Sequence, residues 1–160
     1  MSKPSNTSKF IYFAVTFLFF TFVNFHFANL ISDKVNSGWH FSNSLLNIIY
    51  LKNTGAAFSI LQNSTVFLII VSIVALLVMI YFVAKNFENI FMRDIFFLSI
   101  LTSGIVGNLL ERLVFGYVRD FFELTFVIFP VFNFSDVYIN VGVLGIMVLI
   151  LLTKKPIKIL

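Results

Sequence analysis

The chain alternates between long apolar runs and short polar connections. Four runs are apolar enough, and nearly long enough, to cross a bilayer, at residues 10–30, 66–84, 95–110 and 137–152. At 1.5 Å per residue the first run makes about 31 Å of helix, which is close to the thickness of the hydrocarbon core. It is longer than the apolar core of a cleaved signal peptide, so we expect an uncleaved span. The pattern predicts an all-α membrane protein with four transmembrane helices in a single domain.

The connection between the first two runs follows a different pattern. Residues 38–41 and 46–51 are rich in aromatic and β-branched side chains, a composition typical of short strands. Asn53-Thr54-Gly55 interrupts this segment as a turn would. We therefore expect a small β-sheet element lying against the membrane surface.

Composition and charge agree with a membrane protein. Only 11% of the residues are charged, whereas soluble domains usually have about 25%. The net charge of +4 could indicate an anionic partner, but the basic residues flank the apolar runs. They are interpreted as topology signals, so no nucleic-acid partner is expected. With no cysteine and two histidines, we expect neither a metal site nor a cofactor.

The basic residues also predict an orientation. The N-terminus, the 85–94 link and the C-terminal tail carry seven of the eleven Lys and Arg residues. These three segments should therefore be cytoplasmic, and four spans satisfy this arrangement. The 31–65 and 111–136 segments then lie on the outer face of the cytoplasmic (inner) membrane and carry five of the seven acids. The predicted sheet would be extracytoplasmic.

Two of the outer acids lie in aromatic sequence at helix ends. Asp120 follows the third run, and Asp136 stands at the start of the fourth. Asp136 could simply be a helix N-cap, and Asp120 could form an ion pair with Arg112 or Arg119. Their common placement on one side of a small bundle favours a joint role.

Electrostatics predicts how two such acids would behave in contact. At about 3 Å and an effective dielectric constant of about 20, two full charges repel by roughly 5–6 kcal/mol. This corresponds to about four pKa units, so the pair would share one proton at neutral pH. One carboxylate could then take a proton from water while the other acid donates one to a carbonyl.

The third run ends in a polar stripe. Gly104, Asn108 and Arg112 are spaced by four residues and share a helical face, with Gly107 and Glu111 beside them. Glycine allows a close approach of another helix, and the amide and guanidinium supply donors for carboxylates or a substrate backbone. The alternative interpretation is ordinary helix packing with an arginine that reaches the interface.

Three motifs stand in order along the chain. They are Asn53-Thr54-Gly55-Ala56-Ala57-Phe58, then Gly104-x-x-Gly107-Asn108-x-x-Glu111-Arg112-x-x-x-Gly116-x-Val118-x-Asp120-Phe121, then Phe132-Asn133-Phe134-Ser135-Asp136. Together they resemble the bacterial lipoprotein signal peptidases (type II signal peptidases), with their elements N-x-G-A-A-F, G-N-x-x-D-R…G-x-V-x-D-F and F-N-x-A-D. The resemblance covers most of the chain.

The resemblance implies a catalytic pair formed by Asp120 and Asp136. It implies cleavage of the signal peptide from prolipoproteins, before a diacylglyceryl-modified cysteine, by a membrane aspartic endopeptidase in contact with membrane lipid. We also expect a monomer. The positions matching the motifs that would support the site or bind substrate are Asn53, Gly55, Gly104, Asn108, Glu111, Arg112 and Asn133.

The chain departs from the family pattern at a few positions. Where the first span of the family commonly has an acidic residue and, four positions later, a lysine, this chain has Asn24 and Ala28. This puts in question how the first helix is tied to the site. Glu111 replaces the usual aspartate and Ser135 the usual alanine.

Rival functions make different demands on the residues. A serine–lysine peptidase would need Lys34 or Lys52 to be buried and neutral beside a serine. A non-catalytic four-helix transporter or assembly factor would place acids within its spans, and the four predicted spans contain none. A homologue without catalytic activity would not need both Asp120 and Asp136. The aspartic peptidase is therefore the preferred hypothesis.

Overall fold

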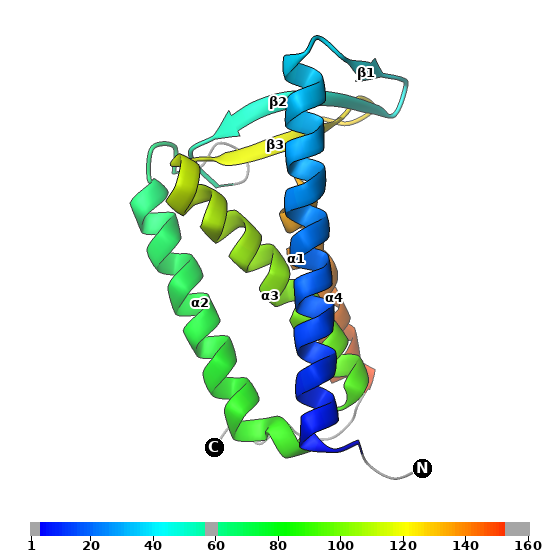
Figure 1. Ribbon diagram of the computed structural model, residues 1–160, viewed down its shortest axis with the longest axis vertical. Coiled ribbons are helices and arrows are strands. Elements are labelled where there is room, and N and C mark those ends of the chain that lie inside the picture. The colour runs from blue at the N-terminus through cyan, green and yellow to red at the C-terminus, as the bar shows by residue number, and fades with distance from the viewer. Residues whose placement is uncertain (1–3, 57–60, 153–160) are drawn as a thin grey trace.

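The fold is mostly helical, with a small sheet at one end (Figure 1). The computed structural model describes residues 4–56 and 61–152. Within them, four helices are long and apolar enough to cross a membrane, which confirms the predicted fold class. Their bounds are α1 Asn6–Asn36, α2 Thr65–Asn86, α3 Met92–Phe115 and α4 Phe134–Leu152, and a short 3₁₀ helix, η2 (Phe87–Asn89), follows α2.

Helix α3 is the centre of the bundle. It packs against α1, α2 and α4, and its contact with α4 is the most extensive (Figure 1). Half of the apolar window of α3 is buried, whereas α2 has no buried residue. The apolar surface of α2 therefore suits contact with lipid.

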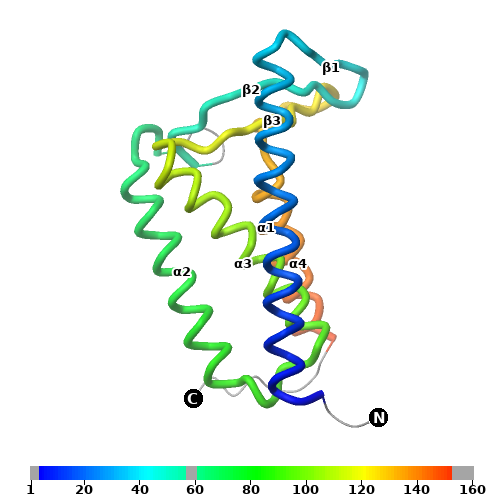
Figure 2. The backbone as a smooth tube through the Cα atoms, in the orientation of Figure 1, coloured from blue at the N-terminus to red at the C-terminus, as the bar shows by residue number. Residues whose placement is uncertain are grey.

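The small sheet has the order β1-β2-β3, and all its strands are antiparallel. The strands are β1 Phe41–Ser42, β2 Leu46–Asn53 and β3 Val118–Leu124. The sheet lies beside the C-terminal part of α1, far from the start of that helix (Figures 1 and 2). Strand β2 contains the predicted 46–51 strand, while β1 begins at the end of the predicted 38–41 segment.

The sequence analysis ended the third span at residue 110 and treated 111–136 as a connection, and the structure differs from this in two respects. Helix α3 continues to Phe115, so Glu111 and Arg112 are helical. Gly116 then adopts a left-handed conformation with φ of 80°, which ends the helix and leads directly into β3. The helix is longer than the apolar run because the run ends with the hydrocarbon region, whereas a helix can continue through polar residues beyond it.

A small apolar core fixes the sheet to the bundle. Ala28 and Ile31 of α1 are buried against Phe121 of β3. Phe122 and Phe134 pack edge to face at 4.9 Å and join β3 to the start of α4. This core positions β3, and with it Asp120, relative to α4.

Two predicted features, Ala57-Phe58 of the first motif and the basic tail 153–160, lie outside the described residues.

Candidate active site

Asp120 is the third residue of β3 and is only 1% exposed. Its Oδ2 accepts a hydrogen bond from Asn53 Nδ2 at 2.8 Å, and its Oδ1 accepts one from Asn133 Nδ2 at 2.7 Å. Within the described residues Asp120 forms no ion pair, so the alternative pairing with Arg112 or Arg119 is wrong. Two neutral amides hold a buried carboxyl group.

Asp136 is held by the first turn of α4. Its backbone N–H donates to Asn133 Oδ1 at 3.0 Å, and its Oδ2 accepts from the Asn133 N–H at 3.1 Å. This reciprocal pair is a capping box in which Asn133 is the N-cap and Asp136 the third helical residue. The alternative of Asp136 as the N-cap is therefore wrong. The positive end of the helix dipole favours a carboxylate here.

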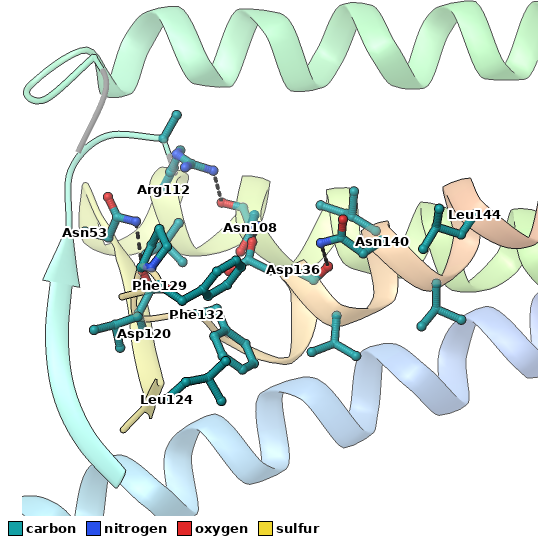
Figure 3. Close-up of a pocket in the computed structure, with 17 residues that line it drawn as sticks. Asn53, Asn108, Arg112, Asp120, Leu124, Phe129, Phe132, Asp136, Asn140 and Leu144 are labelled. Atoms are coloured by element: carbon teal, nitrogen blue, oxygen red, sulfur yellow. Dashed lines mark hydrogen bonds between the residues drawn. The ribbon is translucent and has the colours of Figure 1, made fainter. Parts of the chain in front are cut away.

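Asn133 joins the two acids. Besides capping α4 and donating to Asp120, its Nδ2 donates to Asn108 Oδ1 at 3.2 Å. Asn108 Nδ2 in turn donates to Asp136 Oδ1 at 2.8 Å. Both aspartates line one cavity of about 420 Å³, shown in Figure 3. Residues from β2, β3, α3 and the start of α4 thus place two carboxyl groups in one hydrogen-bonded network.

The electrostatics of Asp120 are unusual for an aspartate. Burial, and next the charge of nearby Asp136, raise the pKa of Asp120 from 3.8 to about 7. The hydrogen bonds from Asn53 and Asn133 oppose this rise because they stabilise the ionised form. At neutral pH Asp120 is therefore partly protonated.

Arg112 stabilises the turn that follows β2. Its Nη2 donates to the Gly55 carbonyl at 2.9 Å, and its Nη1 donates to the Asn108 carbonyl at 3.4 Å. The Gly55 N–H donates to Asn53 Oδ1 at 2.9 Å, which orients the Asn53 amide toward Asp120. Arg112 Nε is buried and has no hydrogen-bond partner among residues 4–56 and 61–152, while the side chain lines the cavity. Arg112 therefore reaches both the turn and the cavity wall.

Gly104 and Glu111 do not line this cavity. A Cβ on Gly104 would lie 2.5 Å from the Ser135 carbonyl oxygen, so glycine permits the close crossing of α3 and α4. Glu111 lies behind the site, where its carboxylate accepts from Arg119 Nη2 at 2.6 Å and from the Arg119 backbone N–H at 2.7 Å. Both residues set the position of the elements that carry the acids.

Comparison with known proteins decides the family. The family model described as signal peptidase (SPase) II matches residues 13–152. The chain belongs to this family. The lipoprotein signal peptidase of Caldicellulosiruptor bescii is 38% identical over 130 residues, covering 76% of this chain and 83% of the relative. That of Enterococcus faecalis is 34% identical over 113 residues, covering 71% and 70%.

A solved structure supports the same assignment. A bacterial membrane enzyme determined by the in meso method at 2.3 Å resolution matches with a TM-score of 0.78 and 27% identity, covering 91% of this chain and 94% of the other. The resemblance predicted from the three motifs is confirmed. This member of the signal peptidase II family is a multi-pass bacterial membrane protease, and the transporter alternative is not favoured.

Two departures from the signal peptidase II pattern meet in the structure. Ser135 Oγ donates to Asn24 Oδ1 at 3.1 Å, and both side chains are buried. Ala28 lies in the apolar core below the sheet. A neutral hydrogen bond therefore connects the first helix to the residue beside Asp136, in place of the charged pair common in the family.

In this signal peptidase II family member, three residues that line the candidate site were not singled out in the sequence analysis: Phe129, Pro130 and Val131. Segment 129–132 lines the cavity, and Phe132 exchanges backbone hydrogen bonds with Phe122 of β3. A second cavity of about 440 Å³ also reaches Asn53 and Asp120, with Lys52 and Gln62 in its lining. Asp120 thus stands where an apolar and a more polar cavity meet. In the sequence, the Phe129-Pro130 pair was the feature that could have indicated this segment, because a proline favours irregular structure.

Proposed function

We propose that this chain removes signal peptides from prolipoproteins as an aspartic endopeptidase, cutting before a diacylglyceryl-modified cysteine. Asp120 and Asp136 would be the catalytic pair. The observation that carries the proposal is that both acids line one cavity and are linked by a single asparagine, Asn133. Membership of the signal peptidase II family supports the substrate class.

The raised pKa of Asp120 assigns the roles in our mechanism. Asp120 carries the shared proton up to about pH 7, because burial and the charge of Asp136 raise its pKa to about 7. Ionised Asp136 takes a proton from water, whose oxygen attacks the scissile carbonyl carbon while Asp120 protonates the carbonyl oxygen. The resulting gem-diol returns a proton to Asp120, Asp136 protonates the leaving nitrogen, and the C–N bond breaks. Water is consumed, and neither acid is changed at the end.

The surrounding residues have supporting roles in this proposal. Asn53 and Asn133 hold Asp120, and Asn108 holds Asp136. Arg112 fixes the turn at Gly55 and borders the cavity, where its guanidinium can bind the substrate backbone. Gly104 and Glu111 act through the packing of α3.

The shape of the cavity supports a lipid-modified substrate. From the acids it continues along α4 to Leu144 (Figure 3). Val137 and Val141 of the same helix also line it. Acyl chains placed there would gain about 0.8 kcal/mol for each buried CH₂ group. We propose that the site lies on the outer face of the membrane and both termini in the cytoplasm. Among the described basic residues, Lys9, Lys85 and Arg93 lie at the helix ends that are far from the sheet (Figure 1). We further propose that the chain acts as a monomer.

Cleavage of matched precursors tests this function. Purified protein in detergent is given one synthetic precursor peptide carrying a diacylglyceryl cysteine and the same peptide with an unmodified cysteine. We expect kcat/KM to be at least about 100-fold higher for the lipidated peptide, because remote binding energy contributes to the reaction. Mass spectrometry should show a product that begins with the lipidated cysteine. Equal cleavage of both peptides, or a cut elsewhere, would contradict the proposal.

The pKa of Asp120 predicts the pH dependence. As the pH rises through about 7, Asp120 loses the proton that it must donate, so kcat/KM should fall. Asn53→Ala removes a donor that stabilises ionised Asp120, so the pKa rises and the alkaline limb should move about one unit higher. The pH profile of kcat/KM on the lipidated peptide measures this.

A matched variant controls for the loss of an asparagine on β2. Asn47 belongs to the same strand, and its amide donates to Glu123 instead of either catalytic acid. Asn47→Ala should leave the alkaline limb in place. An alkaline limb that does not move in Asn53→Ala would show that another group sets it.

A further inference from the structure

One face of α4 changes from polar to apolar along the cavity. Asp136, Asn140 and Leu144 follow one another at intervals of four residues, and all three line the cavity (Figure 3). Each interval corresponds to about 6 Å along the helix axis. The cavity wall therefore presents a carboxylate, then an amide, then an alkyl side chain.

Asn140 is an unusual residue for its place. It lies in an apolar helix long enough to cross a membrane, and its side chain is exposed. Its Nδ2 donates to the Asp136 carbonyl at 2.8 Å, and this is the one hydrogen bond of the Asn140 side chain to the described residues. The amide thus retains a second N–H and a carbonyl oxygen without a protein partner there. In hydrocarbon such groups are costly unless a ligand satisfies them.

We propose that Asn140 is a specificity-determining residue, whose free Nδ2–H donates to an ester carbonyl of the diacylglyceryl group on the substrate cysteine. The inference rests on the proposed function. Ester carbonyls accept hydrogen bonds and cannot donate them, so the remaining N–H of Asn140 is the complementary group.

The order of groups along α4 matches the order of groups in such a substrate. The scissile peptide bond lies next to the cysteine, a thioether-linked glycerol carries the esters, and the acyl chains follow. With the peptide bond at Asp136, the ester groups lie about one helical turn along, at Asn140. The chains then meet Leu144 and Val141, which are exposed and apolar.

Two lipidated peptides that differ only in the carbonyl groups test this inference. One carries a diacylglyceryl cysteine, and the other a dialkylglyceryl cysteine with ether links and the same chain length. For the unaltered protein we expect kcat/KM to be about five- to tenfold higher with the ester, as for one hydrogen bond. Asn140→Leu should lower cleavage of the ester alone, so that the ratio falls to about one.

Three further variants complete the design. Asn140→Gln keeps a free donor and should retain most of the ester preference. Asn140→Thr, whose hydroxyl bonds to its own helix, should lose the preference even if the leucine variant does not fold. Val143→Leu changes an exposed α4 residue that does not line the cavity and should keep the original ratio.

The proposal for Asn140 can fail while the proposed function stands. An ester-to-ether ratio near one in the unaltered protein, or an unchanged ratio in Asn140→Leu and Asn140→Thr, would overturn it. Failure of the proposed function looks different, because the unaltered protein would then cut neither lipidated peptide before its cysteine.

Discussion

Replacing Asp120 or Asp136 by asparagine is expected to lower kcat/KM on a lipidated precursor by about 1,000-fold or more. General acid–base catalysis by one group contributes about 10²–10⁴-fold, and the mechanism requires both groups. Asparagine keeps the volume of the side chain but can neither accept nor release the proton. Cleavage is measured by mass spectrometry of the product in detergent, with each variant at the same concentration.

Controls separate chemistry from folding in this experiment. Asp33 is an exposed acid near the C-terminal end of α1, so Asp33→Asn should retain full activity. Both active-site variants should still insert into the membrane. Some loss of thermal stability is expected, because asparagine offers one acceptor oxygen where each aspartate uses two, so the unfolding temperature of each variant is measured beside the cleavage assay. Substantial cleavage by either variant would refute the catalytic pair.

Glu111→Leu is expected to destabilise the protein by about 3–5 kcal/mol, because breaking a buried ion pair leaves an uncompensated charge. Glu111 is 4% exposed and Arg119 is 7% exposed. The lost carboxylate would also leave the Arg119 backbone N–H, 2.7 Å from Glu111 Oε2, without its partner. Equilibrium unfolding by SDS in mixed micelles measures the change.

A double variant distinguishes charge burial from simple loss of packing. Glu111→Leu with Arg119→Met removes both charges and should recover part of the lost stability. Recovery should be incomplete because the backbone N–H of residue 119 stays unpaired. Equal stability of the single and double variants would mean that the buried charge of Arg119 has little cost.

The apolar runs were sufficient to predict the four helices, because a segment in hydrocarbon must satisfy its backbone internally. The strand β3 could not be predicted in the same way. Arg119, Asp120 and Glu123 interrupt its apolar pattern, and two of these are buried. Their burial is stabilised by Glu111, Asn53 and Asn133, which lie on other elements. The hydrophobic pattern of the strand itself does not show which residues of other elements will pair with its polar side chains.

The same limit applies to the network around the acids. Sequence motifs pointed to Asn53, Asn108 and Asn133, but not to which carboxylate each would contact. The Asn24–Ser135 hydrogen bond spans 111 positions and joins two departures from the family pattern. Each departure alone gave no sign of the other. The assignment of Asp120 and Asp136 as catalytic stays a prediction until the variants are measured.

Asn133 has a consequence for how the two halves of the site behave in time. The same side chain starts α4 and donates to Asp120. When the first turn of α4 frays, Asp136 loses its backbone anchor and Asp120 loses a donor in a single event. If the two acids are the catalytic pair proposed above, order at this helix end and proton transfer depend on the same equilibrium. A substrate that orders the first turn of α4 would then also affect both acids.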